Sequence, residues 1–141
     1  MMNTALLLSG SDKAIVLRTD YSNNESWNAV KAVSASPVGD FAANLMFVED
    51  SSFDGVGPAE LEQALEGKSK SPFIFLADQA TMTGSGYPML CLDLSDEPGS
   101  TFRLIASQAW SVENNLSLGN MDFRDFSSSL DGSGVFRGFK E

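Results

Sequence analysis

The chain has 141 residues, 43% of them hydrophobic, and it carries 19 acidic against 9 basic residues for a net charge of −10. This length fits one domain, and the hydrophobic content excludes an intrinsically disordered chain. The acidic balance argues against nucleic-acid binding, which depends on clustered lysine and arginine. The absence of histidine and the single cysteine, Cys91, exclude a disulfide framework, a Cys/His zinc site and catalysis by an imidazole base.

The amino terminus lacks the features of a targeting segment. Residues 5–8 are apolar, but no basic stretch precedes them and the run is too short to cross a bilayer. We therefore expect no membrane association and a cytoplasmic location. We also expect a single domain over residues 1–141, with residues 1–12 as a flexible start.

Short apolar runs alternate with helical spacing in the first half of the chain. Residues 14–17 predict a strand that runs into a polar turn. The spacing of Ser22 and Glu25 matches a capping box, which predicts a helix from this point that ends at Pro37. A second strand is predicted over residues 41–48.

A short helix and three further strands are predicted in the middle of the chain. Pro58 opens the helix and Gly67 closes it, which is the usual placement of these two residue types. The apolar runs 73–77, 89–94 and 101–106 each predict a strand, and turn residues separate them.

The last third of the chain is predicted to be helical or irregular. Ser111 is the expected cap of one short helix. A second helix is expected to have Asn120 or Asp122 as its cap and to end at Gly132. The tail over residues 135–139 is apolar, so we expect it to dock on the sheet.

These elements predict an α/β (α+β) fold, with a single domain, a mixed five-stranded sheet and helices packed on it. Because helices connect the first three strands, those strands are predicted to be parallel. The third, fourth and fifth strands follow one another without predicted helices, so they are predicted to be antiparallel neighbours.

Three segments of the sequence carry a resemblance. Arg-Thr-Asp-Tyr at 18–21 is followed by Trp27, the segment 96–103 contains Glu-Pro-Gly, and 110–123 contains Trp, then Glu-Asn-Asn-Leu-Ser, then Asn-Met-Asp-Phe. In this order and spacing they resemble an uncharacterised family of small bacterial domains, over residues 15–139. The resemblance implies a self-standing domain of unknown activity, so it implies no catalytic residue and no cofactor.

Carboxylates follow several of the predicted strands. Because the first three strands are predicted to be parallel, Asp20, Asp50 and Asp78, together with Glu49, converge on one edge of the sheet. Oxygen ligands of this kind suit Mg²⁺, so the three aspartates are a candidate metal site. The alternative is that they cap helices and form turns, as aspartates commonly do.

Four arginines lie beside apolar segments: Arg18, Arg103, Arg124 and Arg137. Guanidinium groups bind carboxylate or phosphate with two parallel hydrogen bonds, so Arg18 and Arg103 are candidates for an anion pocket. The alternative is pairing within the protein, for instance Arg18 with Glu113 or Arg103 with Asp20.

A tryptophan precedes an amide-rich segment near the carboxyl terminus. Trp110 with Glu113, Asn114 and Asn115 is a candidate lining of a pocket for a base or a peptide, and it would extend the anion pocket of the arginines. The alternative is a structural role, because asparagines often bond to nearby backbone and tryptophans are often part of the core.

Two acidic stretches, 49–54 and 122–125, each contain a phenylalanine. An aromatic anchor inside a charged rim is typical of a protein interface. The candidate partner-binding residues are Glu49, Asp50, Phe53, Asp54, Asp122 and Asp125.

We therefore expect a non-enzymatic acidic protein that binds a partner with a basic surface, as an inhibitor of the immunity or anti-defence type from a bacterium or phage would. The alternative is a protein that sequesters a small anionic or nucleotide-like ligand in the Arg/Trp/Asn pocket. A third hypothesis is a Mg²⁺-dependent enzyme that uses the strand-end carboxylates. The first hypothesis requires no cofactor.

Overall fold

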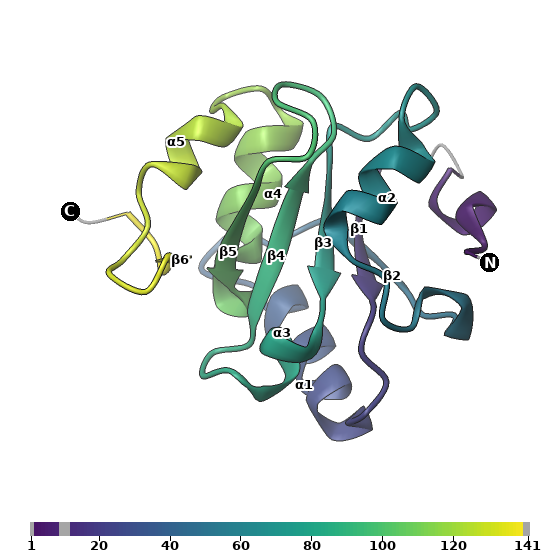
Figure 1. Cartoon of the computed structure of the whole chain (residues 1–141). Coiled ribbons are helices and arrows are strands. Elements are labelled where there is room, and N and C mark those ends of the chain that lie inside the picture. Colours follow the sequence, from purple (N-terminus) through teal and green to yellow (C-terminus); the bar gives the residue numbers. More distant parts are fainter. Residues whose placement is uncertain (1, 9–11, 140–141) are drawn as a thin grey trace.

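The computed structural model describes residues 2–8 and 12–139, and its centre is one mixed sheet of six strands (Figure 1). The order across the sheet is β2-β1-β3-β4-β5-β6. The strands are β1 (Ala14–Arg18), β2 (Leu45–Val48), β3 (Phe73–Ala77), β4 (Pro88–Asp93), β5 (Thr101–Ile105) and β6 (Val135–Phe136). β1 pairs in parallel with β2 and β3, and β4 pairs antiparallel with β3 and β5, as the connections between the strands predict.

The sixth strand corrects the prediction of five. The apolar tail docks on the sheet as expected, and it does so by pairing Val135 and Phe136 in parallel with β5. A strand of two residues has no periodicity of its own, so only the tertiary contact reveals it.

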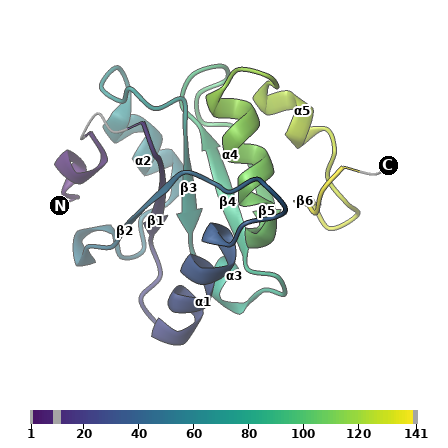
Figure 2. The ribbon, with the colours of Figure 1, turned by 180° about the vertical axis from the view of Figure 1, so that it is seen from behind.

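Helices cover both faces of this sheet. The helices are α1 (Asn24–Ala35), α2 (Pro58–Leu65), α3 (Gln79–Thr83), α4 (Ala109–Ser117) and α5 (Phe123–Ser127), with 3₁₀ turns η1 (Thr4–Leu7), η2 (Ser51–Phe53) and η3 (Ala106–Gln108). α2 lies in front of the sheet in Figure 1, and α1 and α4 lie in front of it in Figure 2, which shows the opposite side.

The side chains of the strands alternate between two buried layers. Val16 and Phe75 pack towards α1 and α4, whereas Leu17 and Leu76 pack towards α2. All four are at most 1% exposed. This double burial explains why the strands appear in the sequence as continuous apolar runs.

Two elements of the first half differ from the prediction. The cap of α1 is Asn23, whose Oδ1 accepts from Ser26 N at 3.0 Å, and the hydroxyl of Ser22 donates to Asp20 instead. The second strand begins at Leu45 rather than at residue 41, because Phe41 pairs back with Val38 in a separate tight turn.

Three helices of the second half also differ. α3 is an unpredicted helix between β3 and β4, and Asp78 caps it by accepting from Thr81 N at 3.2 Å. α4 begins at Ala109, so Ser111 lies buried inside it rather than at its cap. α5 follows Asp122, not Asn120, and ends at Ser127, before Gly132.

The described part of the amino-terminal segment contains one short 3₁₀ helix. Thr4–Leu7 form η1, and Leu7 is buried against the α2 side of the sheet. Residues 1 and 9–11 of the predicted flexible start lie outside the described residues. Across 2–8 and 12–139, no helix has the length and apolar character that crossing a membrane requires.

Candidate functional site

Five carboxylates gather where the parallel strands end. Their loops follow β1, β2 and β3, whose carboxyl ends meet at one edge of the sheet because the strands are parallel. We call this group the acidic edge: Asp20, Glu49, Asp50, Asp54 and Asp78. The chain leaves β1 towards β2 and leaves β3 towards β4, which lie on opposite sides. In open α/β sheets ligands commonly bind at such a divergence.

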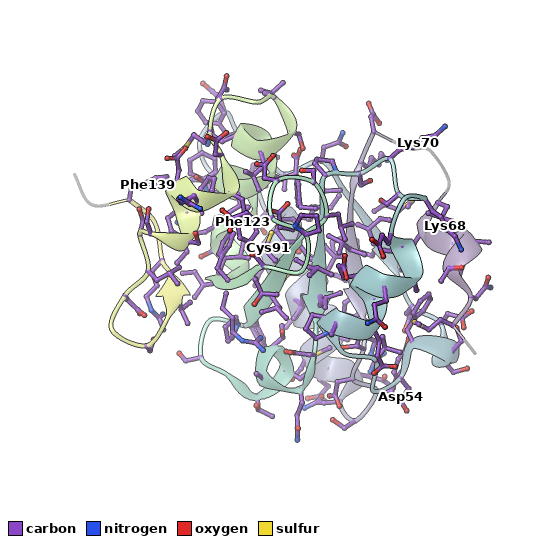
Figure 3. All side chains as sticks on the ribbon, turned by 45° about the horizontal axis from the view of Figure 1, so that its top comes forward. Asp54, Lys68, Lys70, Cys91, Phe123 and Phe139 are labelled. Carbon is purple, nitrogen blue, oxygen red and sulfur yellow. The ribbon has the colours of Figure 1, made fainter. Side chains whose placement is uncertain are left out.

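A crevice of about 410 Å³ opens at this point between the loops after β1, β2 and β3. Asp20, Asp54 and Asp78 contribute carboxylates to its described lining, which contains no lysine or arginine. Gly55 N donates to Thr19 O at 2.8 Å and so fixes the β2 loop against the β1 loop. Figure 3 shows Asp54 at the rim of the molecule, far from the exposed Lys68 and Lys70.

Arg18, at the end of β1, connects the loop after β1 and the start of α1 to Glu49, which follows β2. It is 2% exposed, and its guanidinium lies 4.5 Å from the ring centre of Tyr21. Nε donates to Asp20 O at 2.8 Å, Nη1 to Glu49 Oε2 at 3.0 Å and Nη2 to Asn24 Oδ1 at 2.8 Å. Each of the three guanidinium nitrogens therefore has a hydrogen-bond partner within the protein.

Arg103 reaches the same edge from β5, on the other face of the sheet. Its Nη1 and Nη2 bond to Oδ1 and Oδ2 of Asp78 at 3.0 and 2.7 Å, and Nη1 also donates to Pro88 O. Burial alone would raise the pKa of Asp78. The guanidinium of Arg103 and the hydrogen bonds from Thr81 outweigh burial and hold that pKa below its usual value.

Asp50 is fixed by two neighbours. The Tyr21 hydroxyl donates to Asp50 O at 2.8 Å, and burial raises the pKa of this tyrosine. The Asp50 carboxylate accepts from Ser52 N at 2.9 Å, which lowers the pKa of Asp50.

The ion pairs leave part of the acidic edge uncompensated. Arg18 neutralises Glu49 and Arg103 neutralises Asp78. The charges of Asp20 and Asp54 remain at the crevice, and that of Asp50 remains in the loop after β2. The arrangement suits a cationic group that approaches from solvent.

The same residues do not form a metal cage. Within the described residues, no group of three or more Asp, Glu or Cys side chains is arranged to hold a metal ion. Asp78 is engaged by Arg103, and Asp20 accepts from the hydroxyl of Ser22 at 2.7 Å. The three aspartates share an edge, as predicted, without sharing one coordination centre.

The arginines are paired within the protein, but with other partners than the sequence suggested. Arg18 and Arg103 were expected to pair with Glu113 and Asp20, or to share an anion pocket. In the sheet Arg18 lies opposite Ala77, whose side chain packs on the α1 side, and Arg103 lies opposite Leu90, whose side chain packs on the α2 side. Because residues opposite each other on neighbouring strands share a face, the two arginines point to opposite faces of the sheet. The structure therefore does not bring them together.

The other two arginines are paired as well. Arg124 bonds to Glu97, and Arg137 Nε to Asp131 Oδ2 at 2.6 Å. A cavity of about 780 Å³ lies beside this second pair. The Ser133 hydroxyl and Arg137 hold the pKa of Asp131 far below its usual value. Because these bonds fix the tail that forms β6, a structural role accounts for the pair.

The candidate pocket residues of α4 lie away from the crevice and hold a loop. Glu113 is 4% exposed, and its Oε1 accepts from Asn44 N at 2.6 Å. Asn114 Nδ2 donates to Ala42 O at 3.0 Å. Asn115 Nδ2 bonds within the helix, to Ser111 O at 2.8 Å. These contacts are those expected if the α4 residues have a structural role rather than lining a ligand pocket.

The phenylalanines of the two acidic stretches are buried, which corrects the expectation of aromatic anchors. Phe53 is fully buried and Phe123 is 6% exposed. Figure 3 shows Phe123 in the interior, near Cys91. An acid–Phe–acid sequence does not distinguish a solvated ring from one that turns inward under its acidic neighbours.

The two acidic stretches also lie at opposite ends of the sheet. Glu49, Asp50 and Asp54 belong to the acidic edge. Asp122 lies beside Asp96, in the turn after β4. The end of β4 pairs with the start of β3, so this turn lies at the end of the sheet opposite to the acidic edge. Asp125 lies in α5, and its Oδ2 accepts a hydrogen bond from Asp122 N at 2.8 Å.

Sequence reasoning missed one exposed feature, the tight turn between α1 and β2. Val38 and Phe41 form an isolated antiparallel bridge, and Gly39 adopts a φ of +61° within it. Phe41 is 56% exposed and stacks on Trp110 at 5.6 Å. The signal for it was the Val-Gly-Asp-Phe sequence, a turn with apolar residues on both sides.

Comparison with known proteins bears on the family and not on the activity. No curated protein matches the chain. A family model does match, over nearly all of the residues that form the sheet and its helices, and this confirms the resemblance to an uncharacterised family. The chain belongs to the family described as Domain of unknown function (DUF6924), whose model matches residues 13–139.

Proposed function

We propose that the protein is a non-enzymatic binding protein whose acidic edge docks on a partner protein with a basic surface. The observation that carries the proposal is that its arginines are paired with its own carboxylates. All four form an ion pair with a carboxylate of the same chain. The side chains best suited to clamp an anion are thereby engaged, whereas most of the 19 acidic residues are not paired to them.

The geometry of the acidic edge supports a docking role. Arg18, Tyr21 and Gly55 fix the loops after β1 and β2 to each other, so the carboxylates of these two loops are presented on a well-connected surface. A crevice lined by one sign of charge raises the local concentration of oppositely charged groups and speeds association. An inhibitor of a basic enzyme in the cytoplasm, of the immunity or anti-defence type, is the specific case we propose.

A charge-neutralised variant tests the proposal. Three substitutions keep side-chain shape and remove three charges from the acidic edge: Asp20→Asn, Asp50→Asn and Asp54→Asn. A matched control removes the same charge near the turn after β4, at the other end of the sheet: Glu62→Gln, Glu66→Gln and Asp96→Asn.

Wild type and both variants are immobilised and exposed to soluble extract of the source cells, and retained proteins are eluted with rising salt and identified. Wild type and control should retain the same basic protein and release it between about 0.1 and 0.5 M salt, because screening weakens such contacts. The acidic-edge variant should not retain it. Equal retention by all three proteins, or retention of no basic protein, contradicts the proposal.

A further inference from the structure

An apolar turn stands on the surface of α4. Among the exposed hydrophobic side chains of the described residues are Val38 at 44% and Phe41 at 56%, and they face each other across one turn. The backbone bonds Val38 N to Phe41 O at 2.7 Å and Phe41 N to Val38 O at 3.1 Å close this turn. Figure 2 shows the segment between α1 and β2 passing over α4.

The turn is held rigidly despite its exposure. Phe41 stacks on Trp110 with an interplanar angle of 24°, Asn114 binds Ala42 O, and the buried Glu113 binds Asn44 N. Burying a carboxylate is unfavourable unless it is hydrogen-bonded. The buried Glu113 carboxylate forms its hydrogen bond with the backbone of this surface segment. A rigid exposed aromatic group costs little entropy when a partner binds it.

The only charge in the segment 36–44 is that of Asp40, at the tip of the turn between Val38 and Phe41. A second copy of the protein would bring a net charge of −10 against this surface. A cationic surface is complementary both to Asp40 and to the whole molecule. The turn protrudes, so the apolar pocket must belong to the partner.

We propose that the Val38–Phe41 turn inserts into a shallow apolar pocket, rimmed by lysine or arginine, on the partner protein. This inference rests on the proposed function and names its apolar anchor, Phe41. It replaces the aromatic anchors that the sequence suggested and that the structure buries. The acidic edge attracts the partner, and the turn supplies the buried contact that slows dissociation.

Site-specific photo-crosslinking tests this. Benzoylphenylalanine is placed at Phe41, at Asp54 in the acidic edge, or at Leu118, which is 75% exposed at the carboxyl end of α4. Each protein is irradiated with soluble extract of the source cells at low and at high salt, and adducts are identified by mass spectrometry. We expect a basic protein as the adduct at Phe41, absent at high salt, and no such adduct at Leu118.

The outcomes separate the two proposals. A basic adduct at Asp54 but not at Phe41 overturns the role of the turn and leaves the proposed function standing. No salt-sensitive basic adduct at either position overturns both. An adduct at Leu118 as strong as at Phe41 also overturns the role of the turn, because the contact is then not specific.

Affinity measurements on the identified partner complete the test. Phe41→Ser should weaken binding about 30-fold, the effect typical of an interface anchor, and Asp40→Lys about tenfold, because it places like charge against the basic rim. Leu118→Ser should change the affinity less than about threefold. Thermal melts monitored by circular dichroism establish that each variant is folded. Asp40→Lys lies on an exposed tip, so it remains informative if Phe41→Ser is unstable.

Discussion

Replacing Arg18 by lysine tests the account of how the acidic edge is held. The substitution keeps the positive charge and most of the side-chain length. A lysine ammonium cannot reach Asp20 O, Glu49 and Asn24 at once, because these acceptors lie around the planar guanidinium in three directions. At least two hydrogen bonds are therefore lost.

The expected cost follows from the surroundings of those bonds. A net contribution of about 1 kcal/mol for each hydrogen bond gives about 2 kcal/mol for the pair. The Glu49 side chain is 50% exposed and can be hydrated when it loses its partner, which keeps the cost from rising further. The weaker stacking of an ammonium on Tyr21 acts in the same direction as the lost bonds.

Arg124→Lys is the matched control, because Arg124 is also paired with a glutamate but its side chain is 77% exposed. Exposed pairs contribute little, so this variant should lose less than about 0.5 kcal/mol. Urea unfolding followed by tryptophan fluorescence gives the free energies of unfolding of both variants. Equal losses in the two variants would refute the assignment of Arg18 as the tie between the loops after β1 and β2.

Three further predictions concern protonation, backbone packing and the thiol. The pKa of Asp78 is lowered in the folded state, so its contribution to stability is present above the pKa of the unfolded chain and is lost as the pH falls. Between about pH 5 and about pH 3, urea titrations should therefore show a smaller loss of stability for Arg103→Gln than for wild type. The same loss of stability in both proteins over this range would contradict the prediction. A Cβ on Gly84 would lie 2.7 Å from Ala80 O, so Gly84→Ala should cost about 2 kcal/mol, whereas Gly132→Ala meets no atom within 4 Å and should leave the melting temperature nearly unchanged. Burial raises the pKa of Cys91, so a disulfide reagent should react with it in urea and not in buffer; rapid reaction of the native protein would show that the strand β4 is not buried as described.

The sequence predicts the strands of the sheet and their directions where the local hydrophobic pattern and the length of the connections determine them. Residues 14–17 and 73–77 are continuous apolar runs because both faces of β1 and β3 are covered, and the intervening helices imply parallel pairing. α3 was not predictable, since it has five residues and depends on the cap that Asp78 forms with Thr81. β6 exists only because the tail meets β5.

The candidate site divides in the same way. The meeting of Asp20, Asp50 and Asp78 at one edge follows from parallel strands and was predicted. The partners of Arg18 and Arg103 were not, because they depend on which face of the sheet each side chain takes. That choice is set by strand register, which a single sequence does not specify.

The salt dependence of association tests the central claim most directly, namely that the acidic exterior recruits a basic protein. The association rate constant of the retained partner is measured by stopped-flow fluorescence from about 50 to about 500 mM salt. We predict a fall of at least about tenfold for wild type and for the control at the other end of the sheet, and a much smaller fall for the variant with Asp20, Asp50 and Asp54 neutralised. A rate constant that is independent of salt, or the same fall in all three proteins, would contradict the account.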